Sequence, residues 1–165
     1  LQRVLDAARH TRADVIVETT GDCPLIDPAI VSAVVRRYRE AGVDYVSNVL
    51  TRSYPIGMDT QVFATGVLAD VASRSSDPVD HEHVSLYIYR HPEIYSLGNV
   101  LAPETETRPQ LRLTLDTQED LRVIRNIHEA LRQEGAGYPL RRMIEFLDAH
   151  PETASINAAV AHRWV

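Results

Sequence analysis

Two aspartates stand where short apolar runs end, and they are the residues whose type and spacing could do chemistry. Asp22 lies in a turn after the run at 15–20, and Asp116 directly follows the run at 111–115. Such runs, bounded by turn residues, are typical of buried strands. In open α/β sheets, ligands bind at the carboxyl ends of the strands. Two carboxylates placed there could hold one hard divalent cation, which prefers oxygen ligands and often bridges phosphates.

Each aspartate also has a purely structural interpretation, because aspartates after strands often cap helices. Thr117 and Asp120 have the spacing of a capping box, so a cap is available without Asp116. Asp27 precedes Pro28 and reads as a helix N-cap with proline at the first helical position. Both interpretations of Asp22 and Asp116, ligand and cap, stay open at this level.

Further polar residues are weaker candidates. Arg112 lies on the same predicted strand as Thr114, and its guanidinium could pair bidentately with a carboxylate or phosphate, or face solvent. His81 and His83 suggest zinc, but residues two apart on a helix do not face each other. Cys23 has no base nearby in the sequence and is interpreted as a small buried side chain.

Helix and strand signals alternate along the chain, which predicts one α/β domain over residues 1–165. Apolar spacing predicts helices over the opening residues, 28–41, 66–74, 81–90, 117–131 and from Pro139 onward, while strands are expected at 15–20, 43–49, 60–63, 95–101 and 111–115. The order strand, helix, strand over 15–49 indicates a parallel right-handed crossover. The last dozen residues show weak periodicity and receive no assignment.

Composition excludes several function classes. The formal net charge of −6 provides no general basic face for nucleic acid. No apolar run reaches membrane-spanning length, and the single cysteine fits a reducing compartment, so we expect a cytoplasmic protein without a membrane partner. All 17 basic residues are arginine, which excludes a lysine Schiff base or a phosphate-loop lysine within this chain.

Four stretches, in order, resemble motifs of the cytidylyltransferases that activate Kdo and sialic-type acids, and above all their spore-coat polysaccharide branch. Gly21 to Pro28 reads GDCPLIDP; Tyr54 to Phe63 is similar to YPxGLDVEVF; Glu82 to Ser85 is similar to REHVT without its arginine; and Leu111 to Leu121 is similar to LRxTVDTPEDL. The resemblance covers almost the whole chain. Four ordered motifs are far more specific than any one of them.

The resemblance implies a Rossmann-like, three-layer nucleotide-diphospho-sugar transferase fold, with a mostly parallel sheet flanked by helices. It implies transfer of CMP from CTP to an acidic sugar with release of pyrophosphate. Asp22 and Asp116 would bind Mg²⁺, Arg112 would join them in the catalytic site, and a homodimer is favoured. Residues in the matched motifs would contact the substrate: Tyr54, Asp59, Glu82 and His83.

This sequence also departs from the family pattern. Gln61 stands where glutamate is usual, and His81 replaces an arginine, which puts the choice of sugar in doubt more than the reaction. The family's opening Gly-, Arg- and Ser-rich phosphate loop has no counterpart, so we expect the carboxyl-terminal part of such a domain. Two alternatives remain: a non-catalytic fragment, and a sugar-nucleotide-binding relative of glycosyltransferases. The second alternative predicts a D-x-D metal motif, and no such motif follows any of the expected strands.

Overall fold

The computed structural model describes residues 1–132 and 137–162, and their contacts divide into two compact units. Unit 1 comprises residues 1–19, 32–51 and 60–100. Unit 2 comprises 20–31 and 52–59 together with the described residues from 101 onward. Division by contacts does not test whether the units fold independently, so a single domain over 1–165 stays a prediction.

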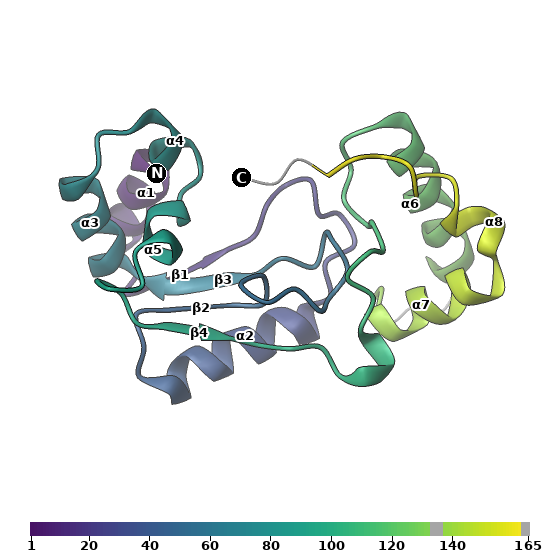
Figure 1. Ribbon diagram of the computed structural model, residues 1–165, viewed down its shortest axis with the longest axis horizontal. Coiled ribbons are helices and arrows are strands. Elements are labelled where there is room, and N and C mark those ends of the chain that lie inside the picture. The colour runs from purple at the N-terminus through teal and green to yellow at the C-terminus, as the bar shows by residue number, and fades with distance from the viewer. Residues whose placement is uncertain (133–136, 163–165) are drawn as a thin grey trace. The chain divides into compact units, whose positions relative to one another are not determined.

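Unit 1 is built on a mixed sheet in the order β1-β3-β2-β4 (Figure 1). Its strands are β1 (Val15–Glu18), β2 (Tyr45–Ser47), β3 (Gln61–Ala64) and β4 (Leu97–Asn99). β3 pairs antiparallel with both β1 and β2, whereas β2 and β4 are parallel. β1 and β2 therefore run in the same direction, as expected for a crossover, but β3 lies between them.

Side chains that alternate along these strands divide the core of unit 1 between the two faces of the sheet. Tyr45 and Phe63 join a cluster with helices on one face, and their rings stack with centroids 6.2 Å apart. Val46 follows Tyr45 in β2, and Val62 precedes Phe63 in β3. Both therefore point to the opposite face, where they pack with Val34. The helices of the first cluster are α1 (Gln2–Thr11), α3 (Thr65–Arg74) and α5 (Leu86–Arg90); α2 (Pro28–Ala41) supplies Val34. A mixed sheet between helical layers confirms the predicted α/β class. Among the described strands, the expected mostly parallel pairing is not found, because β3 runs antiparallel to both of its neighbours.

The predicted helix over 81–90 is wrong, because two short helices replace it. α4 (Pro78–Glu82) ends at its C-cap His83, and α5 begins after Ser85. The backbone leaves helical geometry at His83 (φ −98, ψ 81), and the buried Ser85 that follows donates its hydroxyl to Gln61 Oε1 at 2.5 Å. Asp77, at the N-cap of α4, accepts a hydrogen bond from the Val79 N–H at 2.8 Å.

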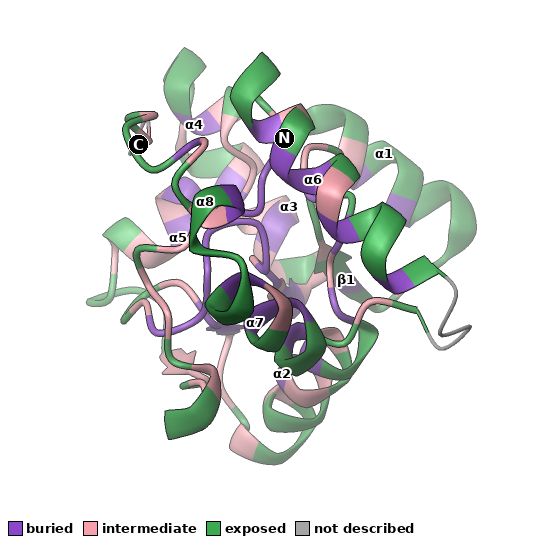
Figure 2. Cartoon of the chain, turned by 90° about the vertical axis from the view of Figure 1, so that its right-hand side faces the viewer, coloured by how far each residue is buried: buried purple, intermediate pink, exposed green. Residues whose placement is uncertain are grey.

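Unit 2 places amphipathic helices beside irregular loops. Its helices are α6 (Gln118–Leu131), α7 (Leu140–Ala149), the short α8 (Pro151–Ala154) and the 3-10 helix η1 (Glu104–Glu106). Figure 2 shows buried and exposed residues alternating along α6 and α7, which pack against each other. The predicted capping box of α6 is confirmed: Thr117 accepts from the Asp120 N–H, and Asp120 accepts from the Thr117 N–H.

The predicted strand at 111–115 is wrong in extent, because the segment makes only one isolated bridge, between Ile56 and Arg112. It is nevertheless held closely. Gly57 has φ +99, and a Cβ at this position would lie 2.6 Å from the Leu113 carbonyl carbon. Only glycine tolerates both that backbone angle and that approach. The loop at 52–59 therefore replaces a sheet neighbour for this segment.

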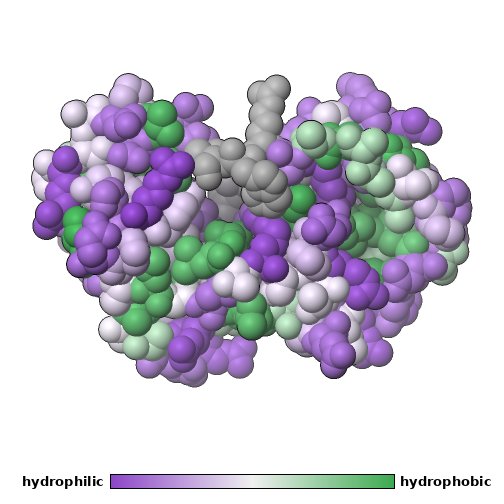
Figure 3. All heavy atoms as spheres, in the orientation of Figure 1, coloured by the Kyte–Doolittle hydropathy of each residue, from purple (hydrophilic) through white to green (hydrophobic). Residues whose placement is uncertain are grey.

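Exposed large apolar side chains are few among the described residues: Val15, Val17, Leu50, Val79, Ile94 and Leu101. Figure 3 shows apolar residues interspersed with hydrophilic ones on the face that it presents. Among the residues that the structure describes, no helix has the length and apolar character needed to cross a membrane.

Candidate active site

Asp22 and Asp116 line one cavity of unit 2, with a volume of about 470 Å³. Its other lining residues are Arg112, Thr117, Val160, Ala161 and His162. Hydrogen bonds join the two segments that carry the aspartates, because the Asp22 carbonyl accepts from the Leu115 N–H at 2.8 Å and from Thr114 Oγ1 at 3.1 Å. A backbone contact, rather than a shared sheet, thus brings the two carboxylates to one place.

Asp22 lies in a turn that its neighbours organise. Burial alone would raise the pKa of its carboxyl, but hydrogen bonds from Thr20, its own backbone, Cys23 and Thr114 leave that pKa lowered. The carboxylate is therefore ionised at neutral pH and can act as an oxygen ligand. Cys23 is 7% exposed, as predicted, and burial raises the pKa of its thiol to about 11, so it is a poor nucleophile.

Arg112 is buried, with 5% of its side chain exposed, which excludes the solvent-facing alternative. Its Nε and Nη2 donate to Asp120 at 2.9 and 3.0 Å, and Nη2 also donates to Asp116 Oδ2 at 2.5 Å. These bonds raise the pKa of the guanidinium, with the Asp120 bond as the largest cause. Arg112 thus reaches the cavity already bound to two carboxylates. That Arg112 binds a substrate carboxylate or phosphate stays a prediction.

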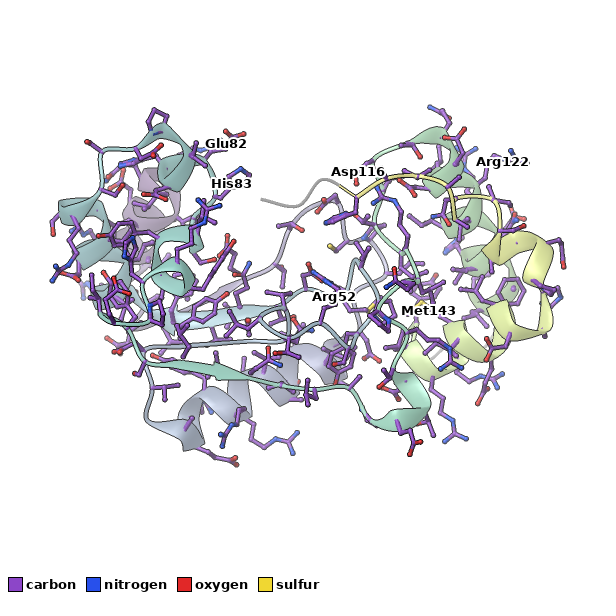
Figure 4. All side chains as sticks on the ribbon, viewed as in Figure 1. Arg52, Glu82, His83, Asp116, Arg122 and Met143 are labelled. Atoms are coloured by element: carbon purple, nitrogen blue, oxygen red, sulfur yellow. The ribbon has the colours of Figure 1, made fainter. Side chains whose placement is uncertain are left out.

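Asp116 precedes Thr117, the N-cap of α6 (Figure 4), and its side chain is 49% exposed. By contrast, Asp120 is completely buried. Burial would raise the pKa of Asp120, but bonds from Arg112, Asn157 and the backbone N–H groups of Asp116 and Thr117 lower it far below its usual value. One aspartate of the motif therefore faces the cavity, while the other is bonded inside the protein.

Two residues of this site come from the segment that received no assignment from sequence. Asn157 is 2% exposed and donates to Asp120 Oδ1 at 2.8 Å. His162 Nδ1 lies 3.0 Å from Arg112 Nη1, and it must be the acceptor because arginine has no acceptor atom. Burial, followed by the charge of Arg112, lowers the pKa of His162. No local pattern marks these contacts, since they join residues 37 to 50 positions apart.

Tyr54 and Asp59 were predicted to contact the sugar, but within unit 2 the first is buried and the second is paired with an arginine. Tyr54 is 4% exposed, and burial raises the pKa of its hydroxyl. Both oxygens of Asp59 accept from Arg52, at 2.7 and 2.8 Å, which favours a structural role for this aspartate in closing the loop. The structure gives no support to direct sugar contacts by these two residues, and such contacts stay a prediction.

Glu82 and His83 belong to unit 1, where they mark the break between α4 and α5. Glu82 is exposed and lines a small cavity with His81 and the first residues of α1, whereas His83 is half-buried. Gln61, the departure from the family pattern, is bonded to the hydroxyls of Tyr45 and Ser85. A substrate role for Glu82 and His83 stays a prediction.

The donor set at the unit 2 cavity fits Mg²⁺ better than zinc. Among the described residues, no group of three or more His, Cys, Asp or Glu side chains could hold a metal ion. Zinc sites need three or four such ligands from the protein. Mg²⁺ is often bound by one or two carboxylates together with substrate phosphates, which matches Asp22 and Asp116.

Comparison with known proteins decides the family. A family model described as cytidylyltransferase matches residues 1–141. The chain belongs to the cytidylyltransferase family. Its fold agrees with that of a solved cytidylyltransferase from Leptospira borgpetersenii, with a TM-score of 0.86 and 28% identity over 98% of this chain and 66% of that one.

Two similar curated proteins extend the comparison. The spore coat polysaccharide biosynthesis protein SpsF of Bacillus subtilis is 29% identical over 94% of this chain and 63% of its own length. The uncharacterized protein MJ1063 of Methanocaldococcus jannaschii is 29% identical over 99% of this chain and 65% of its own length. The chain thus spans somewhat less than two thirds of the length of these two proteins.

Proposed function

We propose that the protein transfers CMP from CTP to an acidic sugar of surface polysaccharide biosynthesis and releases pyrophosphate. The observation that carries this proposal is the convergence of Asp22 and Asp116 on one cavity in a member of the cytidylyltransferase family. Two carboxylates at one cavity would disfavour the triphosphate of CTP unless a divalent cation were bound with it. The donor set therefore supports a Mg²⁺-dependent nucleotidyl transfer.

The reaction makes and breaks bonds at a single phosphorus atom. The sugar hydroxyl oxygen bonds to the α-phosphorus of CTP, the bond from that phosphorus to the oxygen bridging to the β-phosphorus breaks, and pyrophosphate leaves with the bonding pair. The hydroxyl proton passes to solvent or a base. Mg²⁺, when bound, neutralises phosphate charge. Positioning and charge stabilisation supply most of the rate of such transfers, since the protein forms no covalent intermediate.

Residues of the chain have separable tasks in this scheme. Asp22 and Asp116 hold the cation, and the Asp22 carbonyl ties their segments together through Thr114 and Leu115. Arg112 donates to Asp116 Oδ2, which places its guanidinium beside the cation site. Thr117, which also lines the cavity, begins α6 as its N-cap. A rigid first turn of α6 keeps Asp116 in place while substrates exchange.

The sugar is proposed only as an acidic sugar. The name of the SpsF relative links that protein to spore coat polysaccharide biosynthesis, and we extend this link to a sugar of a bacterial surface polysaccharide. Gln61 is uncharged where the family motif usually carries glutamate, so a different hydroxyl or amino pattern on the sugar is expected. Cytoplasmic CTP as substrate supports a cytoplasmic location, and a homodimer is proposed from the resemblance alone.

The test is CMP-sugar synthesis by the full-length gene product, measured as pyrophosphate release with CTP, Mg²⁺ and a panel of Kdo- and sialic-type acids. Asp116→Asn removes a ligand charge but keeps the side-chain volume, so we expect kcat to fall roughly 100-fold or more. Asp148→Asn makes the same change at an exposed site and should keep full activity. Undiminished synthesis by Asp116→Asn would reject the role of this carboxylate, and no synthesis by the wild type with any acid would reject the reaction.

A further inference from the structure

Asp120 has an unusually complete set of hydrogen bonds for a helix-capping residue. Its Oδ1 accepts from Arg112 Nε at 2.9 Å and from Asn157 Nδ2 at 2.8 Å. Its Oδ2 accepts at 3.0 Å from each of Arg112 Nη2, the Asp116 N–H and the Thr117 N–H. The carboxylate is completely buried, so every one of these bonds is formed away from water.

Capping explains only part of this arrangement. A capping box requires that Asp120 accept from the N-cap N–H of Thr117, and this bond is present. It requires neither a bidentate arginine nor Asn157, which also donates to the Arg112 carbonyl at 3.1 Å. These additional bonds hold Arg112 by its main chain and by its guanidinium. Asp120 is therefore organised around Arg112 as much as around the helix.

The charges at this cluster do not cancel evenly. Arg112 carries one positive charge and contacts two carboxylates, one buried at Asp120 and one half-exposed at Asp116. If Arg112 had only Asp116 as partner, that pair would be neutral and a poor ligand for a cation. The bidentate contact with Asp120 instead gives the guanidinium a buried counter-charge. Asp116 then keeps its negative charge, which adds to that of Asp22 at the cavity.

We propose that Asp120 is a positioning residue that neutralises Arg112, so that Asp116 remains a negatively charged ligand for a divalent cation. The inference rests on the proposed cation site. Asp120 also fixes the backbone of Asp116, through its bond to the Asp116 N–H. Orientation and charge balance are separate effects, and they predict different results when both charges are removed together.

The experiment measures Mn²⁺ binding to the full-length protein by the loss of the free-ion paramagnetic resonance signal, which needs no turnover. Asp120→Asn removes the buried counter-charge, so that Asp116 becomes the only carboxylate paired with Arg112. We therefore expect Mn²⁺ affinity to fall roughly tenfold or more. Asp120→Asn combined with Arg112→Gln removes both charges, and affinity should return to within about threefold of wild type. If the double variant binds Mn²⁺ as weakly as Asp120→Asn alone, the proposal that Asp120 acts by neutralising Arg112 is wrong.

Arg112→Gln alone tests the same idea if Asp120→Asn does not fold, as judged by its circular dichroism and melting curve. Charge balance expects this variant to bind Mn²⁺ at least as tightly as wild type, because the cationic competitor is gone. Weaker binding would overturn the proposal. Asp148→Asn, an exposed aspartate of the same unit, is the matched control and should leave affinity unchanged.

Failure of this inference differs from failure of the proposed site. If Asp116→Asn binds Mn²⁺ as tightly as wild type, the cation site itself is wrong. If Asp116→Asn loses binding while Asp120→Asn keeps it, the site is right and the role of Asp120 is wrong. Loss in both, with recovery only in the double variant, is the result expected.

Discussion

Unit 1 and unit 2 differ in what holds their distant segments together. In unit 1, ladders between strands align the chain, and alternating apolar side chains such as Tyr45 and Val46 fill both faces of the sheet. In unit 2, polar side chains and close backbone contacts connect loops, as Arg112 and Asp120 do. Unit 2 also holds the cavity with the two aspartates. The two candidate catalytic carboxylates thus lie where structure depends on individual polar contacts.

The largest expected effect on stability comes from Gly57, which makes a close backbone contact in unit 2. Gly57→Ala would force a Cβ to within 2.7 Å of the Leu113 and Thr114 backbone at a positive φ. We expect the free energy of unfolding to fall by at least about 3 kcal/mol, measured by urea denaturation. Gly66→Ala, in helix α3 of unit 1, meets nothing within 4 Å and should stabilise by about 1 kcal/mol. A fully stable Gly57→Ala protein would show that the loop can move away from the segment at 111–115.

The pH dependence of stability should have opposite signs in the two units. The pKa of Asp120 is lowered in the folded state, so its contribution is complete above its unfolded pKa of about 4 and is lost gradually as the pH falls from there through the lowered folded pKa. Burial raises the pKa of Glu18 in unit 1, so its charged form costs stability as the pH rises from about 4.3 through the raised folded pKa.

Two isosteric variants separate these contributions in urea titrations at pH 3 and pH 7. Asp120→Asn should destabilise by more than about 1 kcal/mol at pH 7 and by somewhat less at pH 3, where the unfolded chain has begun to take up the proton but the folded carboxylate, with its strongly lowered pKa, is still charged. Glu18→Gln should stabilise slightly at pH 7 and change little at pH 3, because protonated glutamate and glutamine are both neutral. The same sign for both variants at pH 7 would contradict the contrast.

Thr117→Ala is the smallest expected effect and concerns only the capping half of the α6 box. The side chain accepts from the Asp120 N–H at 3.2 Å, so its loss should cost about 1 kcal/mol in thermal or urea unfolding. Thr105→Ala, an exposed site in η1, should change stability by less than about 0.5 kcal/mol. An equal effect of the two substitutions would show that Asp120 holds α6 without the threonine.

Regular elements were predictable from the sequence because their signals are local. The apolar spacing and the caps of α2 and α6 specify both helices within a few residues, and turn residues locate Asp22 after β1. Asp120 was predicted only as a capping residue. Its bonds to Arg112 and Asn157 connect positions 8 and 37 residues away, and such contacts leave no periodic pattern. The segment at 111–115 was predicted as a strand from its apolar and polar residues, but Arg112, Leu113 and Thr114 are all buried and its neighbour is a loop.

The central claim is that Asp22 and Asp116 together hold the cation that accompanies CTP. Its most direct test is a crystal structure of the full-length protein with Mn²⁺ and CTP, recorded at a wavelength where manganese scatters anomalously. We predict an anomalous peak at bonding distance, roughly 2.0–2.3 Å, from a carboxylate oxygen of Asp22 and from one of Asp116. A peak bound to neither aspartate, or to other residues of the chain, would contradict the account.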